Sequence, residues 1–238
     1  MALIEYKLEE KVAIVTLNSG ENRFNPEFLK AWSDTMDEIE NETDALTMVV
    51  TSADEKIFCN GIDLMWLMEI KNAKKDEESK QFFYSLNQFF KRTLMSPLLT
   101  IACINGHSFA GGAIWSCAFD FRHMRSDRGY FCYPEADLNI PFLPGMIGLL
   151  KKAIPLQKMD EMVMTGERLT AEQCLENKIV RHIAHNDTLL EETMAYAQTL
   201  NKSRGYVKEM RHRLYHDIIH ALEVEDVPYI ESGRLVIE

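Results

Sequence analysis

The stretch Asn105–Trp115 reads N-G-H-S-F-A-G-G-A-I-W and follows the apolar run Leu98–Ile104, which predicts a buried strand. It places three glycines, Gly106, Gly111 and Gly112, in a passage that is otherwise suited to a protein core. Glycine weakens both helices and strands. Three glycines so close together therefore indicate a backbone that bends sharply or closely approaches another group.

A second passage has the same form. The buried strand predicted over Ala45–Thr51 leads to a loop containing F-C-N-G-I-D-L, Phe58–Leu64. In open α/β folds, ligands lie beyond the carboxyl ends of strands, and two backbone N–H groups aimed at one point there would stabilise a developing oxyanion. Two ordinary turns are the alternative. Neither passage is a dinucleotide-binding G-x-G-x-x-G or a phosphate-binding G-x-x-x-x-G-K-[ST] motif.

Composition narrows the class of protein. The 238 residues suit one large domain with a core, and 46% apolar and 26% charged residues are typical of a globular protein. A net charge of -11 argues against nucleic acid or an anionic membrane as the main partner, although a few basic groups could hold a small anion. No apolar run approaches the roughly 20 residues of a membrane span, and the start M-A-L-I-E-Y-K lacks a signal-peptide pattern.

Cysteine usage favours a cytosolic protein. The chain has five cysteines without a C-x-x-C motif, and most of them stand in apolar runs, so we expect buried, reduced thiols at Cys59, Cys103, Cys117, Cys132 and Cys174.

Hydrophobic periodicity predicts strands that alternate with helices. We expect a hairpin over Tyr6–Leu8 and Val12–Leu17, later strands over Phe121–Arg125 and Tyr130–Tyr133, and helices from Pro26, over Phe82–Met95, over Ala113–Phe119 and through most of the chain after Met146. The segment Lys71–Lys80 is rich in Lys and Glu and is predicted to be a polar connection between helices. Thr170 and Gln173 have the spacing of a capping box. This order predicts an α/β domain with C-terminal helices.

Glu135 is the candidate general base. It lies in Y-F-C-Y-P-E-A-D-L, beyond an apolar strand, and Pro134 restricts the backbone just before it. A carboxylate that is partly desolvated there would have a raised pKa, which suits a base. A solvent-facing glutamate is the alternative, and Asp137 is the competing acid because it would share a face with Glu135 in an extended chain.

Two further patterns are interpreted as structural. His212, His216 and His220 recur every four residues on a predicted helix, but they mix with charges and form no H-E-x-x-H motif, so a solvated or subunit-facing stripe is favoured over a metal site. Cys59 has no histidine in its own motif to activate it, which favours packing over nucleophilic chemistry.

Three motifs together resemble the crotonase, or enoyl-CoA hydratase/isomerase, superfamily. They are F-C-N-G-I-D-L, N-G-H-S-F-A-G-G and Y-P-E-A-D-L, in that order, followed by T-G-E-R-L-T-A-E-Q-C-L-E-N-K-I-V. The resemblance implies an α/β fold, a spiral of ββα units with a C-terminal helical region. It covers a core domain over residues 1–200, and residues 201–238 form a helical tail.

The resemblance also implies a mechanism. The N–H groups of Ile62 and Gly111 match the family's oxyanion donors for an acyl-CoA thioester. Hydratases of the family carry two glutamates, but Ile114 replaces the first and Glu135 matches the second. A single base beside an enolate pocket favours a Δ3,Δ2-enoyl-CoA isomerase. Another CoA-enolate reaction, such as hydration or decarboxylation, and a binding or scaffold protein without turnover remain the alternatives.

The substrate contacts expected from the resemblance are Arg23, Phe24, Asn60, Asp63, Leu64, Gly112 and Ile114. Acyl-CoA would be the substrate, with no separate cofactor and no metal. A homotrimer or a dimer of trimers in the cytoplasm is expected.

Overall fold

The computed structural model describes residues 2–233, which contain a large sheet of six strands and a small sheet of four. The large sheet begins with an antiparallel hairpin, as the sequence predicts, and its other neighbouring strands are parallel. In spatial order its strands are β1 (Ile4–Glu9), β2 (Val12–Leu17), β3 (Thr47–Ser52), β5 (Leu99–Ile104), β7 (Phe121–Arg125) and β10 (His182–Ala184).

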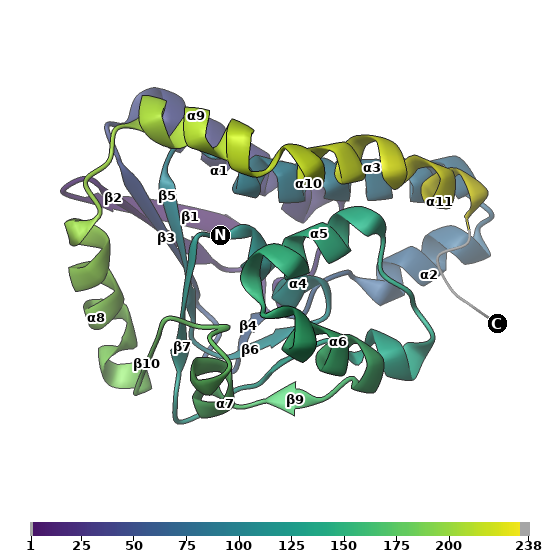
Figure 1. Ribbon diagram of the computed structural model, residues 1–238. Helices are drawn as coiled ribbons and strands as arrows, with labels where there is room; N and C mark the ends of the chain where they lie inside the picture. Colours follow the sequence, from purple (N-terminus) through teal and green to yellow (C-terminus); the bar gives the residue numbers. More distant parts are fainter. Residues whose placement is uncertain (1, 234–238) are drawn as a thin grey trace.

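Three strands of the large sheet are each followed by a short strand of the small one. Thus β3 leads to β4 (Ile57–Cys59), β5 to β6 (His107–Phe109) and β7 to β8 (Phe131–Cys132), while β9 (Arg168–Leu169) completes the small sheet. A helix follows each pair, and Figure 1 shows the resulting units wound one after another. The predicted spiral of ββα units is therefore confirmed.

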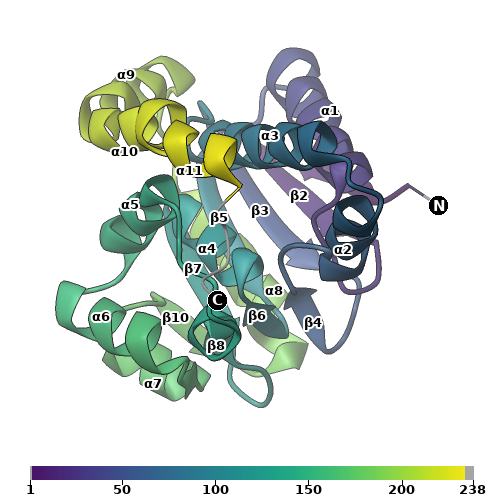
Figure 2. The ribbon, with the colours of Figure 1, turned by 90° about the vertical axis from the view of Figure 1, so that its right-hand side faces the viewer.

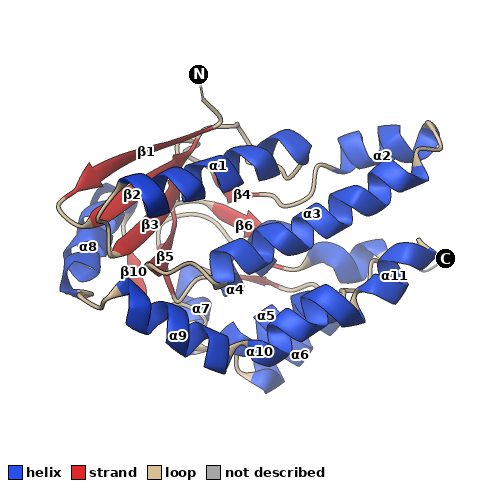
Figure 3. Cartoon of the chain, turned by 90° about the horizontal axis from the view of Figure 1, so that it is seen from above, coloured by secondary structure: helices blue, strands red, loops and turns tan. Residues whose placement is uncertain are grey.

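The helices cover both faces of the large sheet (Figures 1 and 3). One face packs against α8 (Asn186–Thr199), where Val49 and Ile101 of the sheet join Leu189 of the helix in a small apolar cluster. The other face packs against α1 (Pro26–Glu42) and α3 (Asp76–Leu94), which bury the main core. The remaining helices are α2 (Leu64–Asn72), α4 (Gly111–Ala118), the 3₁₀ helix η1 (Pro134–Leu138), α5 (Pro144–Ala153), α6 (Leu156–Thr165) and α7 (Ala171–Glu176).

An aromatic cluster lies at the centre of the main core. Trp115 of α4 is fully buried, and its ring meets that of Trp32 edge-on with centroids 4.9 Å apart. Phe24 and Phe89 pack against the same indole. Since α4 also begins at Gly111, this packing fixes the helix whose first residue carries one of the predicted oxyanion donors.

The polar segment 71–80 is more ordered than its composition predicts. Helix α2 continues to Asn72 and α3 already begins at Asp76, so only three residues connect them. Asp76, Glu77 and Glu78 form the first turn of α3, where their charges interact favourably with the helix dipole. Most of Lys71–Lys80 is thus itself helical, and residues 71–78 are exposed to solvent, as the polar composition predicts.

Residues 204–232 form a row of short helices beside α3 and α5 (Figure 2). They are α9 (Arg204–Leu214), α10 (His216–His220), the π-helical turn η2 (Ala221–Glu225) and α11 (Val227–Ser232). The amide of Asn87 on α3 donates to the carbonyl oxygen of Leu222 at 2.9 Å, which ties this row to the core. The proposed domain division at residue 200 stays a prediction.

Candidate active site

Three of the predicted site residues surround one small cavity. Ile62 lies just after β4, Gly111 opens α4 and Glu135 stands in η1, and all three line a space of about 80 Å³. The rest of the lining is almost entirely apolar and comes from α2, α3, α4, α5 and the loop before α5: Leu64, Leu67, Lys71, Phe83, Ile114, Ile140, Pro141, Phe142, Leu143 and Met146.

The main chain leaves the amide of Ile62 without an internal partner. Phe24 and Ile62 form an isolated parallel β-bridge. Phe24 donates its N–H to the carbonyl oxygen of Gly61 at 2.7 Å, and its own carbonyl accepts from the N–H of Asp63 at 2.9 Å. Both hydrogen bonds use the neighbours of Ile62, so the N–H of Ile62 takes no part in the bridge. The N–H of Gly111, at the first position of α4, has no partner within its helix. Within residues 2–233, neither amide donates a hydrogen bond, and both are available to a ligand.

Close packing of glycines brings these two amides together. Gly61 has φ +72, and a Cβ placed on it would lie 2.5 Å from the nitrogen of Gly111. A Cβ on Gly111 would lie 3.4 Å from the nitrogen of Ile62. On Gly112 a Cβ would collide with the carbonyl oxygen of Cys59, which confirms the close backbone approach predicted for this passage.

The residue before Gly111 is strained. Ala110 has φ 52 and ψ -131, a conformation that residues with a Cβ rarely adopt. Its N–H donates to the carbonyl oxygen of Cys132 in the small sheet at 3.1 Å, which helps to hold the backbone there. Such strain persists only where the surroundings enforce it. Here it sets the direction in which α4 begins.

Glu135 is buried, with 8% of its surface exposed. Desolvation by burial raises the pKa of its carboxyl group from 4.5 to about 7, and no charged side chain among the described residues contributes to offset it. Its Oε2 atom is enclosed and has no hydrogen-bond partner among the described residues. A carboxylate in this state is a strong proton acceptor near neutral pH.

Asp137 is separated from Glu135 by the local helix. The segment Pro134–Leu138 is a 3₁₀ turn rather than an extended strand end, so residues two apart do not share a face. Asp137 is exposed and does not line the cavity. The expectation that these two carboxylates face the same way is therefore wrong.

Some of the other predicted substrate contacts line the cavity and some do not. Leu64 and Ile114 line the cavity. The side chain of Phe24 is fully buried in the aromatic cluster, and Gly112 packs on Cys59, so neither borders the cavity.

Three polar residues were predicted from the resemblance to contact the substrate: Arg23, Asn60 and Asp63. Arg23 and Asp63 border an open groove of about 260 Å³. The Nε atom of Arg23 pairs with Glu21 at 2.6 Å, and Asp63 caps α2 by accepting from the N–H of Trp66. The side-chain oxygen of Asn60 is enclosed and has no donor within the described chain.

The two structural interpretations agree with the coordinates. Cys59 is buried, desolvation raises the pKa of its thiol to about 12, and its Sγ lies 3.1 Å from the carbonyl oxygen of Asn22. The three histidines are exposed, and a break at Tyr215 places His212 on a different helix from His216 and His220. No cluster of metal-binding side chains occurs among residues 2–233.

Sequence reasoning missed most of the cavity wall. Phe142 and Met146 line the cavity but were not predicted as site residues. It also missed Asp226, which is fully buried behind α5 and accepts from the N–H of Gly145 at 2.8 Å. No local motif marks these residues, because the fold brings them together from segments far apart in the chain.

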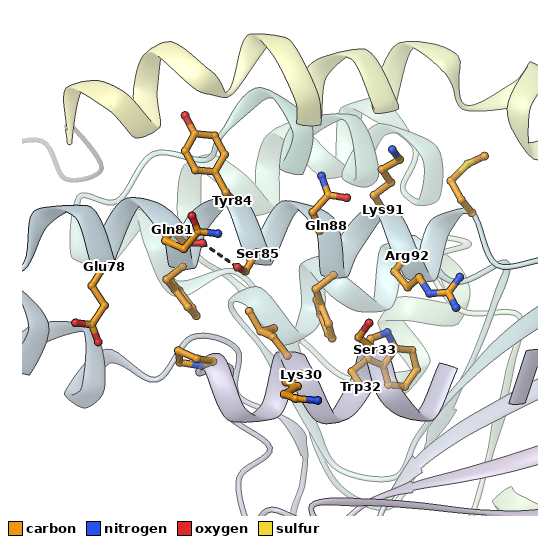
Figure 4. A pocket seen from close by; sticks show the side chains of 15 residues that line it. Lys30, Trp32, Ser33, Glu78, Gln81, Tyr84, Ser85, Gln88, Lys91 and Arg92 are labelled. Atoms are coloured by element: carbon orange, nitrogen blue, oxygen red, sulfur yellow. Dashed lines mark hydrogen bonds between the residues drawn. The ribbon is translucent and has the colours of Figure 1, made fainter. Parts of the chain in front are cut away.

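A larger hollow lies elsewhere. A groove of about 880 Å³ runs between α1 and α3, with Ser33 on one side and Arg92 on the other (Figure 4). None of the predicted site residues lines it. The guanidinium of Arg92 is already paired with Asp37 and Glu40. We therefore place the chemistry in the smaller cavity, where the buried carboxylate and the free amides meet.

This combination of spiral fold and amide-flanked cavity places the molecule among the crotonase-type proteins. More particularly, the family model for enoyl-CoA hydratase/isomerase matches residues 7–226, so the chain belongs to that family. Helices able to cross a membrane are absent from residues 2–233.

The names of the curated relatives describe several different activities. Enoyl-CoA delta isomerase 3 of Arabidopsis thaliana is 24% identical over 213 residues, covering 86% of this chain and 88% of that protein. Carnitinyl-CoA dehydratase of Escherichia coli O157:H7 is 32% identical over 187 residues, covering 79% and 69%. Short-chain-enoyl-CoA hydratase of Clostridium acetobutylicum is 28% identical over 186 residues, covering 76% and 69%.

Solved structures agree on the fold. An enoyl-CoA hydratase/isomerase family protein from Pseudomonas syringae superposes with a TM-score of 0.88 at 19% identity and covers 98% of both chains. At this identity the likeness shows the fold alone.

Proposed function

We propose that the protein is a Δ3,Δ2-enoyl-CoA isomerase. In the proposed reaction, the N–H groups of Ile62 and Gly111 bind the thioester oxygen of a 3-enoyl-CoA. Glu135 removes a proton from C2, the negative charge spreads over a dienolate, and the same carboxyl group returns the proton at C4. The double bond then lies between C2 and C3, and no atom is gained or lost.

One observation carries this proposal: Glu135 is the one acidic side chain among the described residues that line the cavity. Hydration needs a second group to position and activate water, and Ile114 stands where hydratases of the family have that glutamate. Ile114 is buried and apolar, so it keeps water from that side of the proposed intermediate. The raised pKa of Glu135, about 7, lets the same group act as base and then as acid.

The two free amides support the proposed charge stabilisation. Charge on the thioester oxygen grows as the proton leaves, so donors fixed at that point favour the transition state over the bound substrate. Loss of one such donor typically raises the barrier by about 3–4 kcal/mol.

Other crotonase reactions are the second candidate, since relatives include a hydratase and a dehydratase. A scaffold without turnover is less favoured, because a buried carboxylate without a partner destabilises a protein that does not use it. We further propose that Arg23, Asn60 and Asp63 contact the CoA portion, and that the protein is a cytoplasmic homotrimer or dimer of trimers.

An absorbance assay distinguishes these candidates. With a 3-enoyl-CoA as substrate, an isomerase raises the absorbance of the conjugated thioester. With trans-2-enoyl-CoA as substrate, an isomerase leaves this absorbance almost unchanged, whereas a hydratase lowers it. Glu135→Gln is expected to abolish the rise and to keep acyl-CoA binding. Asp137→Asn, two residues away and exposed, is the matched control and should retain the rate. A near-normal rate in Glu135→Gln would show that the base is a different residue.

A second variant tests the role of Ile114. Ile114→Glu restores the missing acid of the hydratases, and we expect measurable loss of the conjugated signal from trans-2-enoyl-CoA. If the folded variant shows no hydration, the cavity differs from a hydratase in more than this residue.

A further inference from the structure

We infer that the cavity selects short acyl chains, of about four to six carbons, and that Phe83 is a residue that sets this limit. The inference rests on the proposed function for the identity of the ligand as an acyl-CoA. It adds the substrate class, which neither the fold nor the family determines.

The volume of the cavity gives the limit. An engineered apolar cavity of roughly 150 Å³ accepts the six carbons of benzene, so the space of about 80 Å³ beside Glu135 holds roughly three. With the thioester carbon at the two amides, those three carbons are C2, C3 and C4, the atoms between which Glu135 moves the proton. Leu64 also lines the cavity but is exposed, so a shift of its side chain can admit one or two more carbons. A still longer chain needs one of the buried walls to move.

The walls are large and well packed. Phe83 and Met146 are 5% and 7% exposed, respectively, so their side chains have little free space into which to withdraw. The ring of Phe142 stands edge-on to that of Tyr133 with centroids 5.7 Å apart, and Phe83 makes the same type of contact with Phe82 at 5.4 Å. Forcing extra methylene groups into such packing is unfavourable.

A buried polar network joins the two helices that carry these walls. Asp226 accepts from the N–H of Gly145 at 2.8 Å, next to Met146 on α5. It also accepts from the side-chain amide of Asn87 at 2.9 Å. Asn87 lies one helical turn after Phe83 on α3, so both residues are on the same side of that helix. The network therefore restrains the separation of α3 and α5, which would have to increase to admit a longer chain.

Binding of saturated acyl-CoAs tests the inference without requiring turnover. Titration calorimetry with butanoyl-, hexanoyl-, decanoyl- and tetradecanoyl-CoA should show a loss of about tenfold or more in affinity between hexanoyl- and decanoyl-CoA. Equal or tighter binding of the long chains would overturn the inference. In parallel, rates with 3-enoyl-CoAs of the same lengths test the proposed function, since short-chain binding without isomerisation would contradict only the proposed reaction.

The matched variants are Phe83→Leu and Phe90→Leu. Both residues lie on α3 and are buried, but Phe83 lines the cavity and Phe90 does not. Phe83→Leu should bind decanoyl-CoA several-fold more tightly than the unmodified protein, whereas Phe90→Leu should leave the length preference unchanged. An equal effect of both variants, with folding verified by circular dichroism, would show that Phe83 does not set the limit.

Discussion

Replacing Glu135 by Gln should stabilise the folded protein at alkaline pH. Burial raises the pKa of this carboxyl group from 4.5 to about 7, so between these values the folded chain binds a proton that the unfolded chain releases. Stability due to Glu135 is therefore complete below about pH 4.5 and falls as the pH rises to about 7. The two pKa values differ by about 2.5, which at roughly 1.4 kcal/mol per pH unit corresponds to about 3 kcal/mol. Gln keeps the shape and carries no charge to desolvate.

Urea unfolding at pH 4 and pH 8.5 measures this difference. The variant and the unmodified protein should have nearly equal free energies of unfolding at pH 4. At pH 8.5 the variant should be more stable by about 3 kcal/mol. Asp226 also has a pKa raised by burial, to about 6, but it is present in both proteins and its contribution cancels. Asp137→Asn, at an exposed position, should show no such pH-dependent gain. Equal stabilities of Glu135→Gln and the unmodified protein at pH 8.5 would refute an uncompensated buried carboxylate.

Three further predictions concern the same cavity. The rate of isomerisation should fall as the pH drops below about 7, because protonated Glu135 cannot accept the C2 proton, and a pH–rate profile that stays flat to pH 5 would contradict this. Gly61→Ala should lower kcat by about 100-fold while circular dichroism stays normal, since its Cβ would displace the amide nitrogen of Gly111. Ala110→Gly should raise the free energy of unfolding by about 1 kcal/mol in urea by relieving the strain at φ 52, and a destabilised variant would show that this backbone is not strained.

Local patterns predicted the parts of the fold that depend on local physics. Short apolar runs marked the hairpin and the buried strands at 47–52 and 99–104. The capping box at Thr170 and Gln173 forms as predicted, because both of its hydrogen bonds lie within one helical turn. Gly111 and Gly112 stood out because a glycine pair in an apolar run has few structural explanations. The burial of Glu135 agrees with its place after an apolar strand.

The features that sequence reasoning missed depend on contacts between distant segments. Phe142 and Met146 are ordinary apolar residues, and only tertiary packing brings them to the same cavity. Asp226 is an acidic residue in a charged stretch, E-V-E-D, and nothing local distinguishes it from its exposed neighbours. The expectation that Glu135 and Asp137 share a face was also wrong. This segment is a 3₁₀ turn rather than an extended chain, so the two side chains point in different directions.

Several unfavourable features of the molecule concentrate around one cavity of about 80 Å³. Within the part of the chain that the structure describes, Glu135 lacks a counter-charge and two main-chain amides lack acceptors, and Ala110 adopts a strained conformation just before Gly111. Each of these lowers the stability of the free protein, and a core built for stability alone would contain none of them. A single bound carbonyl oxygen would satisfy both amides, and the acidic C–H beside that carbonyl would give Glu135 a proton to accept. The three features thus have a common explanation in an activated acyl group, and the surrounding aromatic core supplies the rigidity that keeps them in place.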